Sequence, residues 1–274
     1  NHHDIDLSPF APYYPSMTNL FAAAGMDLPA SGGGKTVRAI SRSLRQPLFN
    51  LKTLDEAINR DRALFSPTGE QTATAKAYAK RAKSARFQKQ SEVAVRPIFI
   101  SEVLVKLLGY APLDPESAYT LAYEHPIRSG AVDVALGDFG RADGKGGIIA
   151  PFELKGPGTI DLDAVMPGRG RSPVQQAWDY AIDAPGSKWV LVSNCLGVRL
   201  YGFGRGRDAY EVFDLTRLDE EDKYERLWLM LSARRFLDGS LDKLLRESDS
   251  AYKDVTNKLY IEFKGLRDRL IDFL

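Results

Sequence analysis

Cysteine is almost missing from this chain, since Cys195 is the only one among 274 residues. A lone cysteine forms no internal disulfide, and its place in the apolar stretch 189–195 indicates a small core residue rather than a reactive thiol. Chains without disulfides are typical of reducing compartments, so we expect a cytoplasmic location. The sequence also has no zinc-ligand spacing, no basic zipper and no other known DNA-reading motif.

Long apolar runs are missing as well. No segment approaches the roughly 20 apolar residues that span a bilayer, and no secretory pattern opens the sequence, so we expect no membrane partner. The formal net charge is only +1, so any nucleic-acid-binding surface has to be local. With 44% hydrophobic residues, the chain can form one large domain, with or without a helical extension.

Helical spacing dominates the first half of the chain after an irregular, Pro-rich stretch 1–35 that ends in a Gly-rich linker. Helices are predicted over 53–63, 68–90 and 91–110, and Pro97 is expected to kink or split the last of them. The helix over 68–90 carries a run of cations, which indicates either a solvated face or a phosphate-contacting one. The residues of this run are Lys76, Lys80, Arg81, Lys83, Arg86 and Lys89.

A change to alternating apolar residues then predicts about six strands. They lie near 119–123, 132–136, 148–154, 189–194, 198–203 and 210–213. A helix over 173–183 interrupts them, and the chain is helical again from Glu220 onward. The predicted fold class is therefore α/β, with a mixed central sheet flanked by helices and a C-terminal helical extension.

Three residues carry the strongest chemical signal: Asp133 in one strand, and Glu153 and Lys155 in the next. Side chains alternate along a strand, so Glu153 and Lys155 project to the same side. If the strands pair, Asp133 and Glu153 converge on one hard divalent cation, and the Leu154 carbonyl can add a ligand. Such a cation activates water and clamps a phosphate, while Lys155 offsets transition-state charge. The set predicts a Mg²⁺-dependent nuclease, with a chance Glu-x-Lys in an unrelated α/β protein as the alternative.

The segment after Lys155 favours the nuclease. Its loop holds Arg169 and Arg171 in a Gly-Arg-Gly-Arg run, which fits a phosphate-gripping loop as well as an ordinary solvated one. On the following helix, Gln176 and Tyr180 are four residues apart and share a face. Gln176 can then reach the lysine, a water or a phosphate; the alternative is a helix with its aromatic residues in the core and its glutamines outside.

An acid, a Glu-x-Lys and a Gln-x-x-x-Tyr helix in this order resemble the PD-(D/E)xK nuclease superfamily. The chain is most similar to the N-terminal cleavage domain of type IIG and related single-chain restriction–modification enzymes. Segment 91–110 resembles the helix that opens that domain, and 244–260 resembles the helical spacer that leads to a methyltransferase. The resemblance extends over roughly residues 85–274 and rests on short motifs.

The resemblance implies a Mg²⁺-dependent endonuclease that hydrolyses double-stranded DNA. It also assigns roles: metal ligands Asp133, Glu153 and Glu92, and catalytic residues Asp133, Glu153, Lys155 and Gln176. Arg169 and Arg171 are expected to contact DNA from the basic loop itself. For Glu92 the alternative is a carboxylate favoured by the helix dipole.

Two features depart from the family pattern. Val132, rather than proline, precedes Asp133, and the connection 138–147 is longer than a tight hairpin. A shifted register would make Asp138 or Asp143 the ligand. Asp133 is preferred because it lies inside the alternating run.

No methyltransferase signature is present: there is no Asn-Pro-Pro-Tyr, and no Gly-rich cofactor loop follows the helices. The chain pattern and the resemblance together predict an irregular or helical segment over 1–60, a nuclease domain over 61–217 and a helical spacer over 218–274. Methyltransferase and target-recognition regions are then expected elsewhere in the same full-length chain, and cleavage of both strands is compatible with a transient dimer. The alternatives are a repair or mobile-element nuclease of the same superfamily, and a non-catalytic DNA-binding scaffold domain.

Overall fold

The structure is a computed structural model that describes residues 45–273 except 129, 142, 144 and 145. The predictions for the irregular stretch 1–35 and its linker lie outside these residues. The described part of the chain belongs to one compact unit that begins at Arg45.

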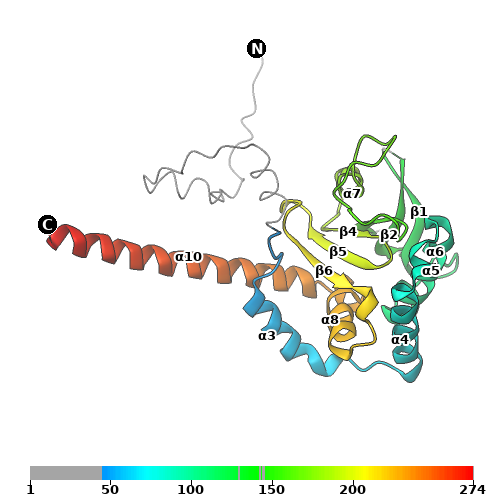
Figure 1. Cartoon of the computed structure of the whole chain (residues 1–274), viewed down its shortest axis with the longest axis horizontal. Helices are drawn as coiled ribbons and strands as arrows, with labels where there is room; N and C mark the ends of the chain where they lie inside the picture. The colour runs from blue at the N-terminus through cyan, green and yellow to red at the C-terminus, as the bar shows by residue number, and fades with distance from the viewer. Residues whose placement is uncertain (1–44, 129, 142, 144–145, 274) are drawn as a thin grey trace, which may run out of the picture. The chain divides into compact units, whose positions relative to one another are not determined.

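Six strands form one mixed sheet in chain order, β1-β2-β3-β4-β5-β6 (Figure 1). Neighbouring strands are antiparallel except β3 and β4, which are parallel. The strands are β1 Tyr119–Ile127, β2 Gly130–Phe139, β3 Gly147–Leu154, β4 Trp189–Ser193, β5 Gly197–Gly202 and β6 Tyr210–Asp214. The predicted strands and the predicted α/β class are thus confirmed.

Helix α7, Pro173–Asp183, covers one face of the sheet (Figure 1). Parallel neighbours cannot be joined by a tight hairpin, and α7 lies in the crossover from β3 to β4. Its start is fixed by a capping box, in which Ser172 and Gln175 bond each other's backbone N–H, with Pro173 in the first turn. Its apolar side packs on β4 and β5 through Val174, Ala177, Ala181, Val190, Val192 and Tyr201.

The opposite face of the sheet carries the main core, covered by helices from both ends of the described chain (Figure 1). These are α3 Leu51–Asp61, η1 Arg62–Leu64, α4 Gly69–Lys83, α5 Ala85–Gln88, α6 Glu92–Phe99, η2 Ile100–Leu107, η3 Leu215–Arg217, α8 Glu221–Leu231, α9 Ala233–Leu237 and α10 Ser240–Phe273. None of the described helices is long and apolar enough to cross a membrane.

Two predicted helices are each divided in two. The segment 68–90 breaks at Ser84, which has extended backbone and caps α5 by accepting from the Phe87 N–H. The segment 91–110 passes through Pro97 and then widens into the π-helix η2. Proline cannot donate its hydrogen bond to the preceding turn, so a local change of winding close after Pro97 is the expected physical result.

The helices that follow β6 contribute to the main core as far as the first turns of α10. Leu227 of α8, Phe236 of α9 and Leu241 of α10 all belong to the main core cluster. Residues 252–271 of α10 are exposed instead. The expected domain boundary at 217/218 stays a prediction.

Removal of the α7 cap tests how this helix is held. We expect Ser172→Ala to lower the free energy of unfolding by about 1 kcal/mol, because the Gln175 N–H loses its acceptor. Thr68→Ala, which removes the equivalent capping box of α4, is the matched control and should cost a similar amount. Chemical denaturation measures both, and a Ser172→Ala variant as stable as the wild type would contradict the assigned cap.

Candidate active site

The sheet brings the three predicted residues to one place, the carboxyl end of β3. The antiparallel register of β2 and β3 ends with the pair Val134 and Phe152. Asp133 and Glu153 are the next residues beyond this pair, one on each strand. Glu153 is paired with Val192 of β4, whose side chain packs with α7, so Glu153 faces α7.

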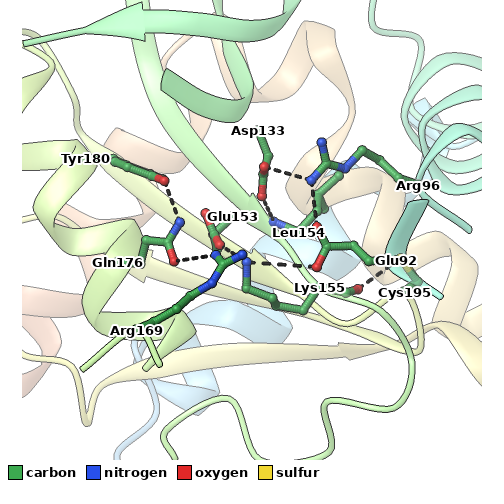
Figure 2. Close-up of polar contacts among 10 residues, drawn as sticks. All are labelled: Glu92, Arg96, Asp133, Glu153, Leu154, Lys155, Arg169, Gln176, Tyr180 and Cys195. Carbon is green, nitrogen blue, oxygen red and sulfur yellow. Dashed lines mark hydrogen bonds and ion pairs between the residues drawn. The ribbon is translucent and has the colours of Figure 1, made fainter. Parts of the chain in front are cut away.

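The Asp133 carboxylate is held at both oxygens (Figure 2). Oδ2 accepts a hydrogen bond of 2.9 Å from the backbone N–H of Leu154, and Oδ1 accepts one of 2.8 Å from Nη2 of Arg96. The first bond ties the carboxylate to β3 and the second ties it to α6. Asp133 therefore has a fixed orientation toward the end of β3.

Glu153 and Lys155 form a buried ion pair beside it, with exposed fractions of 0% and 2%. Glu153 Oε1 contacts the Lys155 ammonium, whereas Oε2 is buried and has no hydrogen-bond partner among the described residues. The pKa of Glu153 is raised to about 8, chiefly by burial and also by the nearby Asp133 carboxylate, while Lys155 partly offsets both. A fully buried carboxylate is thus held close to Asp133, and one of its oxygens has no hydrogen-bond partner.

The first turn of α6 closes the site from the other side. Glu92 Oε1 accepts a hydrogen bond of 2.7 Å from Arg96, and Glu92 Oε2 lies 4.0 Å from Lys155 Nζ. Gly156 permits this approach, because a Cβ at its position would lie 2.9 Å from the backbone nitrogen of Glu92. The structure thus places Glu92 next to the lysine, while its predicted role as a metal ligand stays a prediction.

Arg96 is the site residue that the sequence patterns did not reveal. Burial lowers the pKa of its guanidinium, but Asp133 and Glu92 outweigh burial and the pKa is raised overall. The spacing of four residues from Glu92 indicates a pair within the helix. No signal in the sequence places that pair against Asp133, which lies 37 residues away.

Gln176 and Tyr180 of α7 border the cluster on the Glu153 side (Figure 2). Gln176 is only 7% exposed, donates to the Tyr180 hydroxyl and accepts from Arg169 at 3.5 Å. The alternative in which the glutamines lie outside therefore does not hold for Gln176. Arg171, by contrast, is turned to Asp179 at 2.9 Å.

The competing acids lie elsewhere. Asp138 is paired with Gly147, at the hairpin end of β2 and β3 rather than at the end that carries Asp133. Arg141 binds both Asp138 and Asp143 at 2.9 Å. The register therefore brings Asp133, and neither alternative, next to Glu153.

Cys195 is buried next to Lys155, the residue that follows β3. Its Sγ donates to the Lys155 carbonyl at 3.5 Å, and burial raises the pKa of the thiol to about 12. A thiol so seldom ionised is a poor nucleophile, which agrees with the predicted core role.

The donor set fits Mg²⁺. This hard cation is usually bound by one or two carboxylates and completes its shell with water and phosphate oxygens. Asp133 and Glu153 supply two carboxylates, and the buried, unpartnered Oε2 of Glu153 is an oxygen ready for a ligand. Among residues 45–273 as described, no three His, Cys, Asp or Glu side chains form a ready metal-binding group. Asp133 and Glu92 both form ion pairs with Arg96.

Comparison with known proteins adds no family: no family model, no curated protein and no solved structure matches the chain. The function is therefore argued from the geometry of the site.

The raised pKa of Glu153 predicts a pH-dependent stability in the absence of metal. Between the unfolded value of 4.5 and the folded value of about 8, the folded state binds this proton more tightly. The contribution to stability is full below 4.5 and is lost as the pH rises through about 8. Glu153→Gln imitates the protonated form, so in EDTA it should be more stable than the wild type at high pH and similar to it at low pH.

Melting temperatures of both proteins across this pH range measure the effect. Glu116→Gln, a change at an exposed glutamate, is the control and should follow the wild type. A Glu153→Gln difference of the same size at every pH would contradict the assigned titration.

Proposed function

We propose that this chain is the Mg²⁺-dependent endonuclease domain of a PD-(D/E)xK restriction–modification enzyme, and that it cleaves double-stranded DNA in the cytoplasm. The observation that carries the proposal is the cluster at the end of β3 in which the buried Glu153 and Lys155 lie beside the half-buried Asp133. Two neighbouring carboxylates with a lysine beside them serve metal-assisted phosphodiester hydrolysis better than they serve stability, since burying them is costly.

Asp133 and Glu153 are the residues that would hold the metal. Bound there, Mg²⁺ would supply Lewis acidity and lower the pKa of a coordinated water. Glu153 has to be deprotonated before it can bind the metal. Its Oε2 atom, which has no hydrogen-bond partner, is the atom that would contact the metal. The Lys155 side chain lies beside Glu153, where it can donate to a non-bridging phosphate oxygen and offset the negative charge that builds up in the transition state.

The residues around the cluster set its charge and orientation. Arg96 forms ion pairs with both Asp133 and Glu92 and so offsets part of their negative charge. Gln176, itself fixed by Tyr180, contacts Arg169 and so steers this exposed cation toward the site. Arg169 is therefore the better phosphate contact of the two loop arginines, because Arg171 already has Asp179 as its partner.

Helix α10 supports the assignment to a longer enzyme. Apolar side chains that include Val255, Leu259, Phe263, Leu266 and Leu270 are exposed on it. We propose that they pack as a spacer against methyltransferase and target-recognition regions of the full-length chain. A transient dimer would place two such sites on the two DNA strands.

A non-catalytic DNA-binding scaffold is the second candidate, favoured by the Arg96–Asp133 ion pair. In a scaffold this pair is permanent, whereas in a nuclease it has to yield to the metal. A repair or mobile-element nuclease would share the site and differ in its DNA target.

Plasmid nicking separates these functions. We expect Mg²⁺-dependent nicking by the chain, and a loss of about 100-fold or more in Glu153→Ala and in Lys155→Ala, because each removes a charge that acts on the transition state. Glu221→Ala and Lys52→Ala change exposed residues of the same types and should nick like the wild type. Nicking that persists in both site variants, or its absence even in a longer natural chain, would reject the nuclease.

A further inference from the structure

A second basic surface precedes the site in the chain. Between Gln71 and Ser91 the sequence has six cations and no acidic residue, although the whole chain has a net charge of only +1. The cations are Lys76, Lys80, Arg81, Lys83, Arg86 and Lys89. They lie on α4, on α5 and just after α5.

Two of these cations serve the fold, since Arg81 pairs with Glu102 and Lys83 pairs with Asp219. The other four are exposed and make no ion pair with any residue that the structure describes. We call these four, Lys76, Lys80, Arg86 and Lys89, the basic ridge. Clustered cations without internal partners are available for an anionic partner.

The surroundings of the ridge favour a phosphate backbone. Lys76 and Lys80 are one helical turn apart on the same face, and the exposed residues Ala73 and Ala77 near them are too small to shield their charge. Both aromatic residues of the stretch, Tyr78 and Phe87, are buried at 0% and 4% exposure. Without exposed rings to stack on bases, this surface suits a duplex rather than a single strand.

The last residue of the ridge lies close to the active site. Lys89 comes three residues before Glu92, and three residues span at most about 11 Å. Glu92 in turn lies 4.0 Å from Lys155. Figure 1 shows α4, α5 and α6 following one another along one side of the sheet. A duplex that brings a phosphate to Lys155 therefore passes close to Lys89.

We propose that the basic ridge binds the phosphate backbone of the DNA duplex whose scissile phosphate enters the Asp133–Glu153–Lys155 site. The proposal rests on the proposed function for the identity of the partner. It adds a sequence-independent DNA contact, carried by α4 and α5, that fixes the path of the duplex across the protein.

Fluorescence anisotropy with a labelled random-sequence duplex tests the ridge, in EDTA so that no cleavage occurs. The ridge variant combines Lys76→Gln, Lys80→Gln, Arg86→Gln and Lys89→Gln. The control combines Lys52→Gln, Lys253→Gln, Lys258→Gln and Lys264→Gln, which removes the same charge from exposed positions of α3 and α10. Melting temperatures verify that both are folded, and single Lys80→Gln and Lys89→Gln variants replace the ridge variant if it is not.

We expect the ridge variant to bind at least about tenfold more weakly at low salt. The slope of log affinity against log salt concentration should fall by about 1 for each phosphate that the variant no longer neutralises. The control should bind like the wild type. Unchanged binding by the ridge variant, equal weakening in both variants, no duplex binding by the wild type, or tighter binding of single-stranded RNA than of the duplex would each overturn the ridge.

Nicking by the same proteins keeps the two proposals separate. A wild type that binds the duplex through the ridge but never nicks it, in a longer natural chain as well, would reject the nuclease and keep the ridge. A ridge variant that binds and nicks like the wild type would reject the ridge and keep the nuclease.

Discussion

Burial of the Glu153 carboxylate next to Asp133 is the constraint on which the rest of the site depends. Two neighbouring acids repel each other, and the raised pKa of Glu153 results from its desolvation together with that repulsion. Two cations offset this repulsion: Lys155, at the end of β3, pairs with Glu153, and Arg96, on α6, pairs with Asp133. These two cations keep the carboxylates together despite the cost of burying them.

Each part of the architecture contributes one side of that cluster. The antiparallel pairing of β2 and β3 sets Asp133 beside Glu153, and the parallel step to β4 requires the crossover that carries α7. Helix α7 then lines the cluster with Gln176 and Tyr180, while Gly156 lets α6 approach with Glu92 and Arg96. Lys155 and Arg96 lie against the two carboxylates, so under the proposed function the binding of a metal and a phosphate would exchange one set of charged partners for another.

The residues of the cluster could be predicted where they depend on local geometry. Alternation along strands is enough to place Glu153 and Lys155 on one side, and a run of apolar neighbours is enough to put Asp133 on the next strand. Arg96 could not be found in this way, because helical periodicity shows which face of α6 is apolar and not which strand end it meets. The break at Ser84 also escaped, whereas Pro97 did indicate a division of the next helix, although not that the second part would be a π-helix.

The chemistry proposed for the site requires that Asp133 and Glu153 share one divalent cation. Anomalous diffraction from crystals of this chain soaked in Mn²⁺ is the decisive measurement. We expect one strong anomalous peak in contact with both carboxylates, with Arg96 withdrawn from Asp133. A saturating soak that leaves the Arg96–Asp133 pair in place and gives no peak between the two carboxylates would contradict a shared metal site.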